Sequence, residues 1–261
     1  TTTLAAEFGT PLYIYDELTL RAKCREFREE FKKRYSNSFI IYAGKAYSNG
    51  ALLNLIKEEN LGLDVVSEGE LGIAKSVNFP MERVYFHGNN KSQHELELAL
   101  QYHVGRIVVD NFQELEMLDK LTKKLGGKQD VLLRMTPGVD PHTHRYTSTG
   151  SLDSKFGFPL PLKEEAVSKA LKIRGLNVVG LHFHIGSLIF EPEPYVESVK
   201  FILKFAAEMR KKYGLELKEL DTGGGFAVRY TIDKPAPPVA TFADKITSTI
   251  VKECTRFSLE L

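Results

Sequence analysis

The first candidate for chemistry is a lysine that follows an apolar run. Residues 39–43 read Phe-Ile-Ile-Tyr-Ala, and Lys45 comes two positions later. A short apolar, β-rich run is typical of a strand that is buried on both faces, and the carboxyl ends of parallel strands open into the ligand crevice. Half-desolvation at such an end lowers the pKa of a lysine and makes its amine a Schiff-base nucleophile. The structural alternative is a lysine that reaches the surface from a strand end.

A glycine turn is the second candidate. Gly223, Gly224 and Gly225 directly follow a predicted strand over 217–221. In parallel barrels, backbone N–H groups at this position commonly hold a phosphate, although a plain flexible turn has the same composition. Together with Lys45, the glycines indicate a phosphorylated aldehyde cofactor. The amine of the lysine would form a Schiff base with the aldehyde group of this cofactor.

Polar side chains of other predicted strands are expected to complete such a site. His182 and His184 alternate along one strand and therefore share a face. They fit a metal pair, a ring stacked on a flat cofactor, or core histidines with satisfied hydrogen bonds. Asp64 of the second strand is expected to pair with Arg134 of the fifth, as part of the site or as an ordinary structural ion pair.

The elements that position these residues alternate regularly. From residue 39 onward, seven units of a strand and a helix follow one another, and Ser67 with Glu70 and Ser92 with Glu95 have capping-box spacing. This alternation predicts parallel strands with right-handed crossovers, in a TIM-type (β/α)8 barrel. Residues 257–261 are expected to begin an eighth strand that is cut off. We interpret the chain as a fragment, because seven strands would leave two unpaired edges.

Two segments lie outside this alternation. Residues 10–15 predict a short strand, so we assign residues 1–15 to an N-terminal strand segment and residues 16–261 to the barrel domain. Residues 136–161 form a long loop rich in Pro, Gly, His, Thr and Ser. Such loops are usually functional or disordered, and Arg134 just before it favours function. Within the loop, His142, His144 and Lys155 receive no role.

Composition excludes several classes of protein. The 35 basic and 34 acidic residues are evenly spread, which argues against nucleic acid or an anionic membrane as a partner. Cys24 and Cys254 are far apart and suggest neither a disulfide framework nor a zinc site. No segment reaches the apolar length of a membrane span, and the first residues lack the features of a secretory signal. We expect a cytoplasmic protein without a bound metal.

Read together, the motifs resemble the diaminopimelate decarboxylase family of fold-type III pyridoxal-phosphate enzymes. The resemblance runs from residue 8 nearly to the end of the chain, and its motif order is specific. The segments that carry it are residues 8–13, 42–46, 63–71, 87–92, 137–144, 154–157, 182–187 and 221–225. Tyr47 departs from the pattern, because an asparagine is common at this place in the family.

The resemblance implies roles at the matching positions. Lys45 would hold pyridoxal 5'-phosphate as a Schiff base and later move protons, and His184 would stack on the cofactor ring. Ser187 and the glycine turn would contact the phosphate, and three polar residues would support the ring. The cofactor-binding set is then Lys45, Asp64, Glu70, Arg134, His184, Ser187, Gly223, Gly224 and Gly225. The implied reaction is decarboxylation of meso-diaminopimelate to L-lysine.

The family also has parts that this sequence does not contain. They are a Glu-Pro-Gly-Arg segment after the eighth strand and a C-terminal β-domain, with a cysteine that comes from the partner subunit of a homodimer. We therefore expect the chain alone to be inactive. The alternatives are a related decarboxylase of ornithine, arginine or carboxynorspermidine, a barrel that binds the cofactor without catalysis, or a metal-dependent hydrolase that uses His182 and His184.

Overall fold

The computed structural model describes residues 1–139, 156–229, 231–233 and 235–261. Seven strands form one parallel sheet whose spatial order follows the chain, β1 to β7. This arrangement confirms the predicted seven strand-helix units of an incomplete (β/α) barrel. The strands are β1 (Ile41–Ala43), β2 (Gly62–Val65), β3 (Val84–Phe86), β4 (Arg106–Val109), β5 (Gln129–Arg134), β6 (Leu176–His182) and β7 (Glu219–Asp221).

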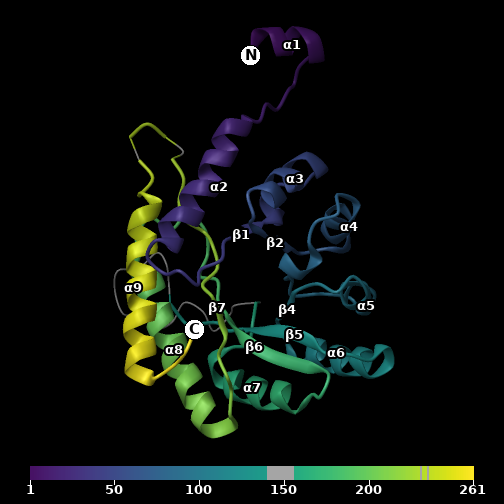
Figure 1. Cartoon of the computed structure of the whole chain (residues 1–261), viewed down its shortest axis with the longest axis vertical. Coiled ribbons are helices and arrows are strands. Elements are labelled where there is room, and N and C mark those ends of the chain that lie inside the picture. Colours follow the sequence, from purple (N-terminus) through teal and green to yellow (C-terminus); the bar gives the residue numbers. More distant parts are fainter. Residues whose placement is uncertain (140–155, 230, 234) are drawn as a thin grey trace.

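Helices connect successive strands and lie around the outside of the curved sheet (Figure 1). The long helices α8 and α9 pack side by side, and α2 packs against α9. The α-helices are α1 (Thr2–Phe8), α2 (Glu17–Lys32), α3 (Gly50–Glu58), α4 (Glu68–Ser76), α5 (Gln93–Gln101), α6 (Phe112–Leu125), α7 (Lys163–Lys172), α8 (Glu193–Tyr213) and α9 (Val239–Phe257). Short 3-10 turns are η1 (Gly44–Ala46), η2 (Met81–Arg83) and η3 (Leu160–Leu162). No described helix is both long and apolar enough to cross a membrane.

The N-terminal segment differs from the prediction. Residues 2–8 form α1, which buries no side chain and projects from the rest of the molecule (Figure 1). Residues 10–15 form no strand, so the predicted strand is wrong. Tyr13 is 87% exposed, because none of the described strands lies beside this segment. Its β-rich composition alone is insufficient, since a strand needs a neighbour for its backbone hydrogen bonds.

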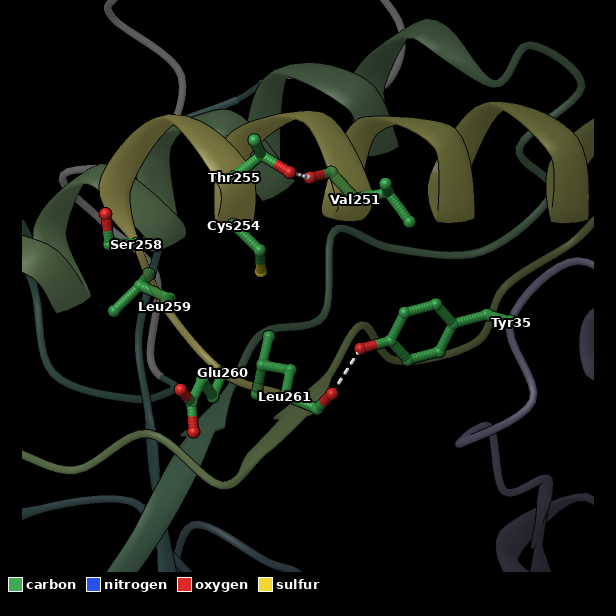
Figure 2. Close-up of a pocket in the computed structure, with 8 residues that line it drawn as sticks. All are labelled: Tyr35, Val251, Cys254, Thr255, Ser258, Leu259, Glu260 and Leu261. Atoms are coloured by element: carbon green, nitrogen blue, oxygen red, sulfur yellow. Dashed lines mark hydrogen bonds between the residues drawn. The ribbon is translucent and has the colours of Figure 1, made fainter.

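At the other end, α9 stops at Phe257, and residues 258–261 form no strand. Figure 2 shows a hollow between this tail, α9 and Tyr35, whose hydroxyl group donates a hydrogen bond to the carbonyl of Leu261. None of the predicted site residues lines this hollow. We therefore looked for the site at the strand ends.

Helix starts show how closely local sequence determines the frame. Asp16 accepts a hydrogen bond from Thr19 N, as a capping residue should. Ser92 and Glu95 form the predicted capping box, with both reciprocal bonds present. Ser67 accepts from Glu70 N, but the carboxylate of Glu70 binds the N–H of Val66 instead of that of Ser67. The second box is therefore only half formed.

The two faces of the sheet have different chemistry. Outward side chains such as Ile107, Val131 and Leu181 join the helices in the main hydrophobic core. Inward side chains follow from the strand register, which pairs Arg134 of β5 with His182 of β6 and His182 with Asp221 of β7. Because paired residues on parallel strands point to the same face, three polar groups gather there at the carboxyl ends.

The opposite end of the inward face is closed by a charged cluster. Arg106 at the start of β4 donates through Nε to Glu219 at 2.9 Å and lies 3.0 Å from Asp130. Tyr85 adds a hydrogen bond of 3.3 Å to Glu219. Above this cluster lies a small apolar layer of Val108, Leu132 and Val179. The interior is thus filled at the amino ends of the strands, and the carboxyl ends remain for a ligand.

Candidate active site

Lys45 lies in the turn η1, directly after β1. Its side chain is exposed, and its amine has no ion pair or hydrogen bond within the described ranges. The predicted half-desolvation is therefore absent. The strand before it is also only partly buried, because β1 pairs with β2 on one side alone. What the sequence predicted correctly is the position of the amine at the carboxyl end of the sheet.

His184 lies two residues beyond the end of β6 and is half-buried. Burial and the nearby positive charge of Lys45 lower its pKa to about 4. The imidazole is therefore neutral at neutral pH. A neutral, flat ring beside a free amine suits stacking on an aromatic ligand, which is the role that the sequence resemblance implies.

The glycine turn and Ser187 lie together. Residues 189 and 226 form an isolated parallel bridge, which holds the loops after β6 and β7 side by side. A Cβ on Gly225 would lie 2.0 Å from the carbonyl oxygen of Gly186 and 3.4 Å from Cα of Ser187, and one on Gly223 would lie 3.1 Å from Nδ1 of His184. Gly223 and Gly225 also have φ values of 65° and 108°. Only glycine permits both this backbone conformation and this contact.

The turn offers unused hydrogen-bond donors. The N–H of Gly223 is bound by Asp221 at 2.8 Å, and the carbonyl of Gly225 accepts from Ile189 N at 3.0 Å. The N–H groups of Gly224 and Gly225 have no partner in the described part of the chain. Adjacent free N–H groups in a glycine turn form an anion-binding concavity.

A buried polar cluster lies at the carboxyl ends of β2, β3, β6 and β7. Nε2 of His87 is 2.9 Å from Oδ1 of Asp64, and the ring of His87 meets that of His182 edge to face, with centroids 4.8 Å apart. Burial keeps the pKa of His182 well below its usual range. Burial and the carboxylate of Asp64 raise the pKa of Asp221 to about 6. Burial therefore favours the uncharged form of both His182 and Asp221.

This cluster also contains the one group of potential metal ligands found among the described residues, His87, His182 and Asp221. It differs from the expected pair, because His184 is not part of it. The positive charges of Arg134 and Lys45 are close enough to lower the pKa of His182. The same charges disfavour a cation at this place.

Arg134 does not make the predicted ion pair with Asp64. Its Nη1 lies 3.5 Å from Oδ1 of Asp110, and its guanidinium group lies over the ring of Phe156 at 4.6 Å. Asp64 still acts on Arg134 at longer range, since it raises the arginine's pKa against the larger lowering effect of burial. The reason for the different pairing is that Asp110 follows β4, the direct neighbour of β5, whereas Asp64 lies three strands away.

Glu70 lies at the side of Lys45. One oxygen of its carboxylate accepts the N–H of Val66 at 2.7 Å, and the same oxygen is 3.6 Å from the position that a Cβ on Gly44 would take. It therefore supports the loop after β2 and faces the turn that carries the lysine. His142, His144 and Lys155 lie outside the described residues, as does most of the predicted functional loop.

Sequence reasoning missed four residues that support the site. Their contacts are visible only in the tertiary structure. Two local signals could have drawn attention to them: the capping residue Ser92, which follows the loop after β3, and the position of residue 110 at the end of β4. The four residues are Lys91, Asp110, Glu114 and Tyr195.

The geometry fits pyridoxal 5'-phosphate. Lys45 offers a free amine and His184 a neutral ring. The glycine turn offers two free N–H groups, and a Cβ on Gly223 or Gly225 would collide with the backbone of the loop after β6. An incomplete parallel barrel with these groups at its carboxyl end defines a barrel that binds a pyridoxal cofactor.

Comparison with known proteins gives the family. Residues 18–260 match the pyridoxal-dependent decarboxylases, in their pyridoxal binding domain, and the chain belongs to this family. It is 42% identical over 260 residues to a diaminopimelate decarboxylase of Bacillus subtilis (strain 168). The matched region covers 99% of this chain and 59% of that protein.

Two solved structures agree in fold. Diaminopimelate decarboxylase of M. jannaschii in complex with L-lysine has a TM-score of 0.91 and 34% identity, over 99% of this chain and 60% of that one. Diaminopimelate decarboxylase of Helicobacter pylori, also in complex with L-lysine, has a TM-score of 0.87 and 32% identity, over 96% of this chain and 62% of that one. The chain thus spans about three fifths of the length of these relatives.

Proposed function

We propose that this chain is the cofactor-binding part of a diaminopimelate decarboxylase, which converts meso-diaminopimelate to L-lysine. The observation that carries the proposal is the meeting of Lys45, His184 and the glycine turn at one end of the sheet, in a chain that is 42% identical to such an enzyme. Related decarboxylases of ornithine, arginine or carboxynorspermidine are the second candidate, because they would use the same cofactor groups.

Each residue has a role that its surroundings support. When bound, pyridoxal phosphate supplies a ring that takes up the electron pair left by the departing carboxylate. Lys45 holds the cofactor covalently, then moves protons, and its exposed position leaves room for the exchange with a substrate amine. The neutral ring of His184 stacks on the cofactor. Arg134, paired with Asp110, and Asp64, beside His87, are supporting polar groups near the ring, and Glu70 supports the loop beside the lysine.

The glycine turn and Ser187 bind the phosphate group in this proposal. The free N–H groups of Gly224 and Gly225 are two donors, and the exposed hydroxyl of Ser187 lies on the adjoining loop. Because Asp221 already uses the N–H of Gly223, this glycine contributes its shape and not its donor. The proposal therefore refines the expectation, implied by the resemblance, that all three glycines contact the phosphate.

The first experiment is an absorbance titration of the chain with pyridoxal phosphate. We expect a band of the lysine-bound cofactor in the wild-type chain and its loss in Lys45→Ala. Lys172→Ala is the matched control, because Lys172 is also exposed but lies at the end of α7. A band that survives in Lys45→Ala, or that is lost in both variants, would contradict the role of Lys45.

Substrate choice needs the whole protein, since the chain spans about three fifths of its relatives. We expect a protein extended to the full length of the relatives to release carbon dioxide from meso-diaminopimelate in preference to ornithine or arginine. The chain of 261 residues should be inactive by itself. Turnover by this chain, or a preference for ornithine, would contradict the respective part of the proposal. The homodimer and the cytoplasmic location stay predictions, and light scattering on the whole protein tests the first.

A further inference from the structure

Tyr195 lies behind the glycine turn, in the first turn of α8. Its side chain is fully buried, its ring is stacked on Phe226 with centroids 5.2 Å apart, and it meets Phe242 edge to face. The hydroxyl group donates a hydrogen bond of 2.9 Å to the carbonyl oxygen of Gly224. A buried hydroxyl needs such a partner, so the tyrosine and the turn determine each other's position.

This bond fixes more than one oxygen atom. In a trans peptide, the carbonyl of one residue and the N–H of the next point in opposite directions across the same plane. The bond between Gly224 and Gly225 is trans, because the only cis peptide in the described residues is that before Pro11. With the oxygen of Gly224 held toward α8, the N–H of Gly225 must point away from α8, on the side of the cofactor concavity.

The turn is thus held at three atoms. Asp221 binds the N–H of Gly223, Tyr195 binds the carbonyl of Gly224, and Ile189 binds the carbonyl of Gly225. The other two bonds do not involve the atoms of the peptide between Gly224 and Gly225, and glycine on both sides restricts the rotation of this peptide less than other residues would. Within the described ranges, the tyrosine hydroxyl is the group that forms a hydrogen bond with this peptide.

We propose that Tyr195 is a positioning residue, which orients the N–H of Gly225 toward the phosphate of pyridoxal phosphate. This inference rests on the cofactor-binding function proposed above. The hydroxyl makes no contact with the ligand. Because the hydroxyl already holds the turn in its binding conformation, less conformational entropy is lost when the phosphate binds, and the affinity is higher.

The test compares two probes that differ only in the phosphate group. Dissociation constants of pyridoxal phosphate and of pyridoxal are measured by spectral titration for the wild-type chain and for Tyr195→Phe, which keeps the ring and its packing. We expect the variant to bind pyridoxal phosphate about 3- to 10-fold more weakly, the effect of one net hydrogen bond, and pyridoxal equally well.

Tyr35→Phe is the matched control. This substitution also removes a tyrosine hydroxyl that donates a hydrogen bond to a backbone carbonyl, in this case that of Leu261. Tyr35 lines the hollow beside α9, to which none of the predicted site residues contributes (Figure 2). We expect the Tyr35→Phe variant to bind both probes like the wild type. Thermal melting of both variants shows whether each remains folded.

The outcomes separate the two proposals. If the wild type discriminates between the probes and Tyr195→Phe does so equally well, the positioning role is wrong and the cofactor assignment stands. If the variant weakens both probes alike, its effect is a general structural one and the positioning role is wrong. If the wild type binds pyridoxal phosphate no more tightly than pyridoxal, the turn does not bind phosphate, and both proposals fail.

Discussion

The ion pair between Lys91 and Glu114 allows a sharp test of how the site is supported. Their side chains are 1% and 2% exposed, and Nζ lies 2.7 Å from Oε1. Nζ also donates to the carbonyls of Gly88 and Val108, at 2.7 and 2.9 Å. The second oxygen of Glu114 accepts the N–H of Asp110 at 2.9 Å. The pair therefore joins the loop after β3 to the end of β4, where Asp110 faces Arg134.

Lys91→Met removes the cation and leaves the carboxylate of Glu114 buried without a counter-ion. Breaking a buried pair in this way costs about 3–5 kcal/mol of the free energy of unfolding. Burial already raises the pKa of Glu114 above its usual value, and loss of Lys91 raises it further. The carboxyl group then becomes protonated as the pH falls, so the penalty is largest at alkaline pH and shrinks toward acid pH.

The assay is urea denaturation at an alkaline and at an acid pH, because the carboxyl group of Glu114 is protonated more readily at the lower pH. Adding Glu114→Gln to Lys91→Met should recover part of the loss, because no buried charge remains. Lys124→Met is the control, since Lys124 makes an exposed pair with Glu97 at 2.8 Å, and it should change stability by less than about 1 kcal/mol.

Two results would refute this reasoning. One is a loss in Lys91→Met no larger than that in Lys124→Met, which would mean that the buried carboxylate finds other partners. The other is a penalty that stays the same at both pH values. That result would mean that the carboxyl group of Glu114 does not change its protonation in the variant.

Three further predictions concern single side chains. Glu59→Gln removes a carboxylate whose pKa is lowered to about 2, mainly by hydrogen bonds from Arg25. With solvent screening included, the free energy of unfolding should fall by about 1–2 kcal/mol at neutral pH, as measured by urea denaturation. This loss should shrink as the pH falls from 4.5 toward 2. A loss that is constant over this range would contradict it. His184→Ala should weaken pyridoxal phosphate binding about 2- to 10-fold through lost stacking, and His184→Phe should restore it; failure of phenylalanine to restore binding would exclude stacking. Gly225→Ala should lower both the melting temperature and cofactor affinity, because its Cβ would lie 2.0 Å from a carbonyl oxygen, whereas Gly224→Ala, with nothing within 4 Å, should melt like the wild type.

Much of the frame follows from the sequence. The seven strands, their order and the helices between them were predicted, because apolar periodicity and capping residues act within a few positions along the chain. The N-terminal strand was wrong for the complementary reason. A strand forms only with a neighbour, and residues 10–15 have none among the described strands.

The partners within the site were decided by the tertiary structure. The sequence by itself placed Lys45, His184 and the glycine turn at the ends of predicted strands. It paired Arg134 with the wrong aspartate and missed Tyr195 altogether. Which inward side chains meet depends on strand register and on the helix that packs behind each loop. Contacts across the sheet bring together residues that are far apart in the chain, and no local pattern of residue types encodes their distances.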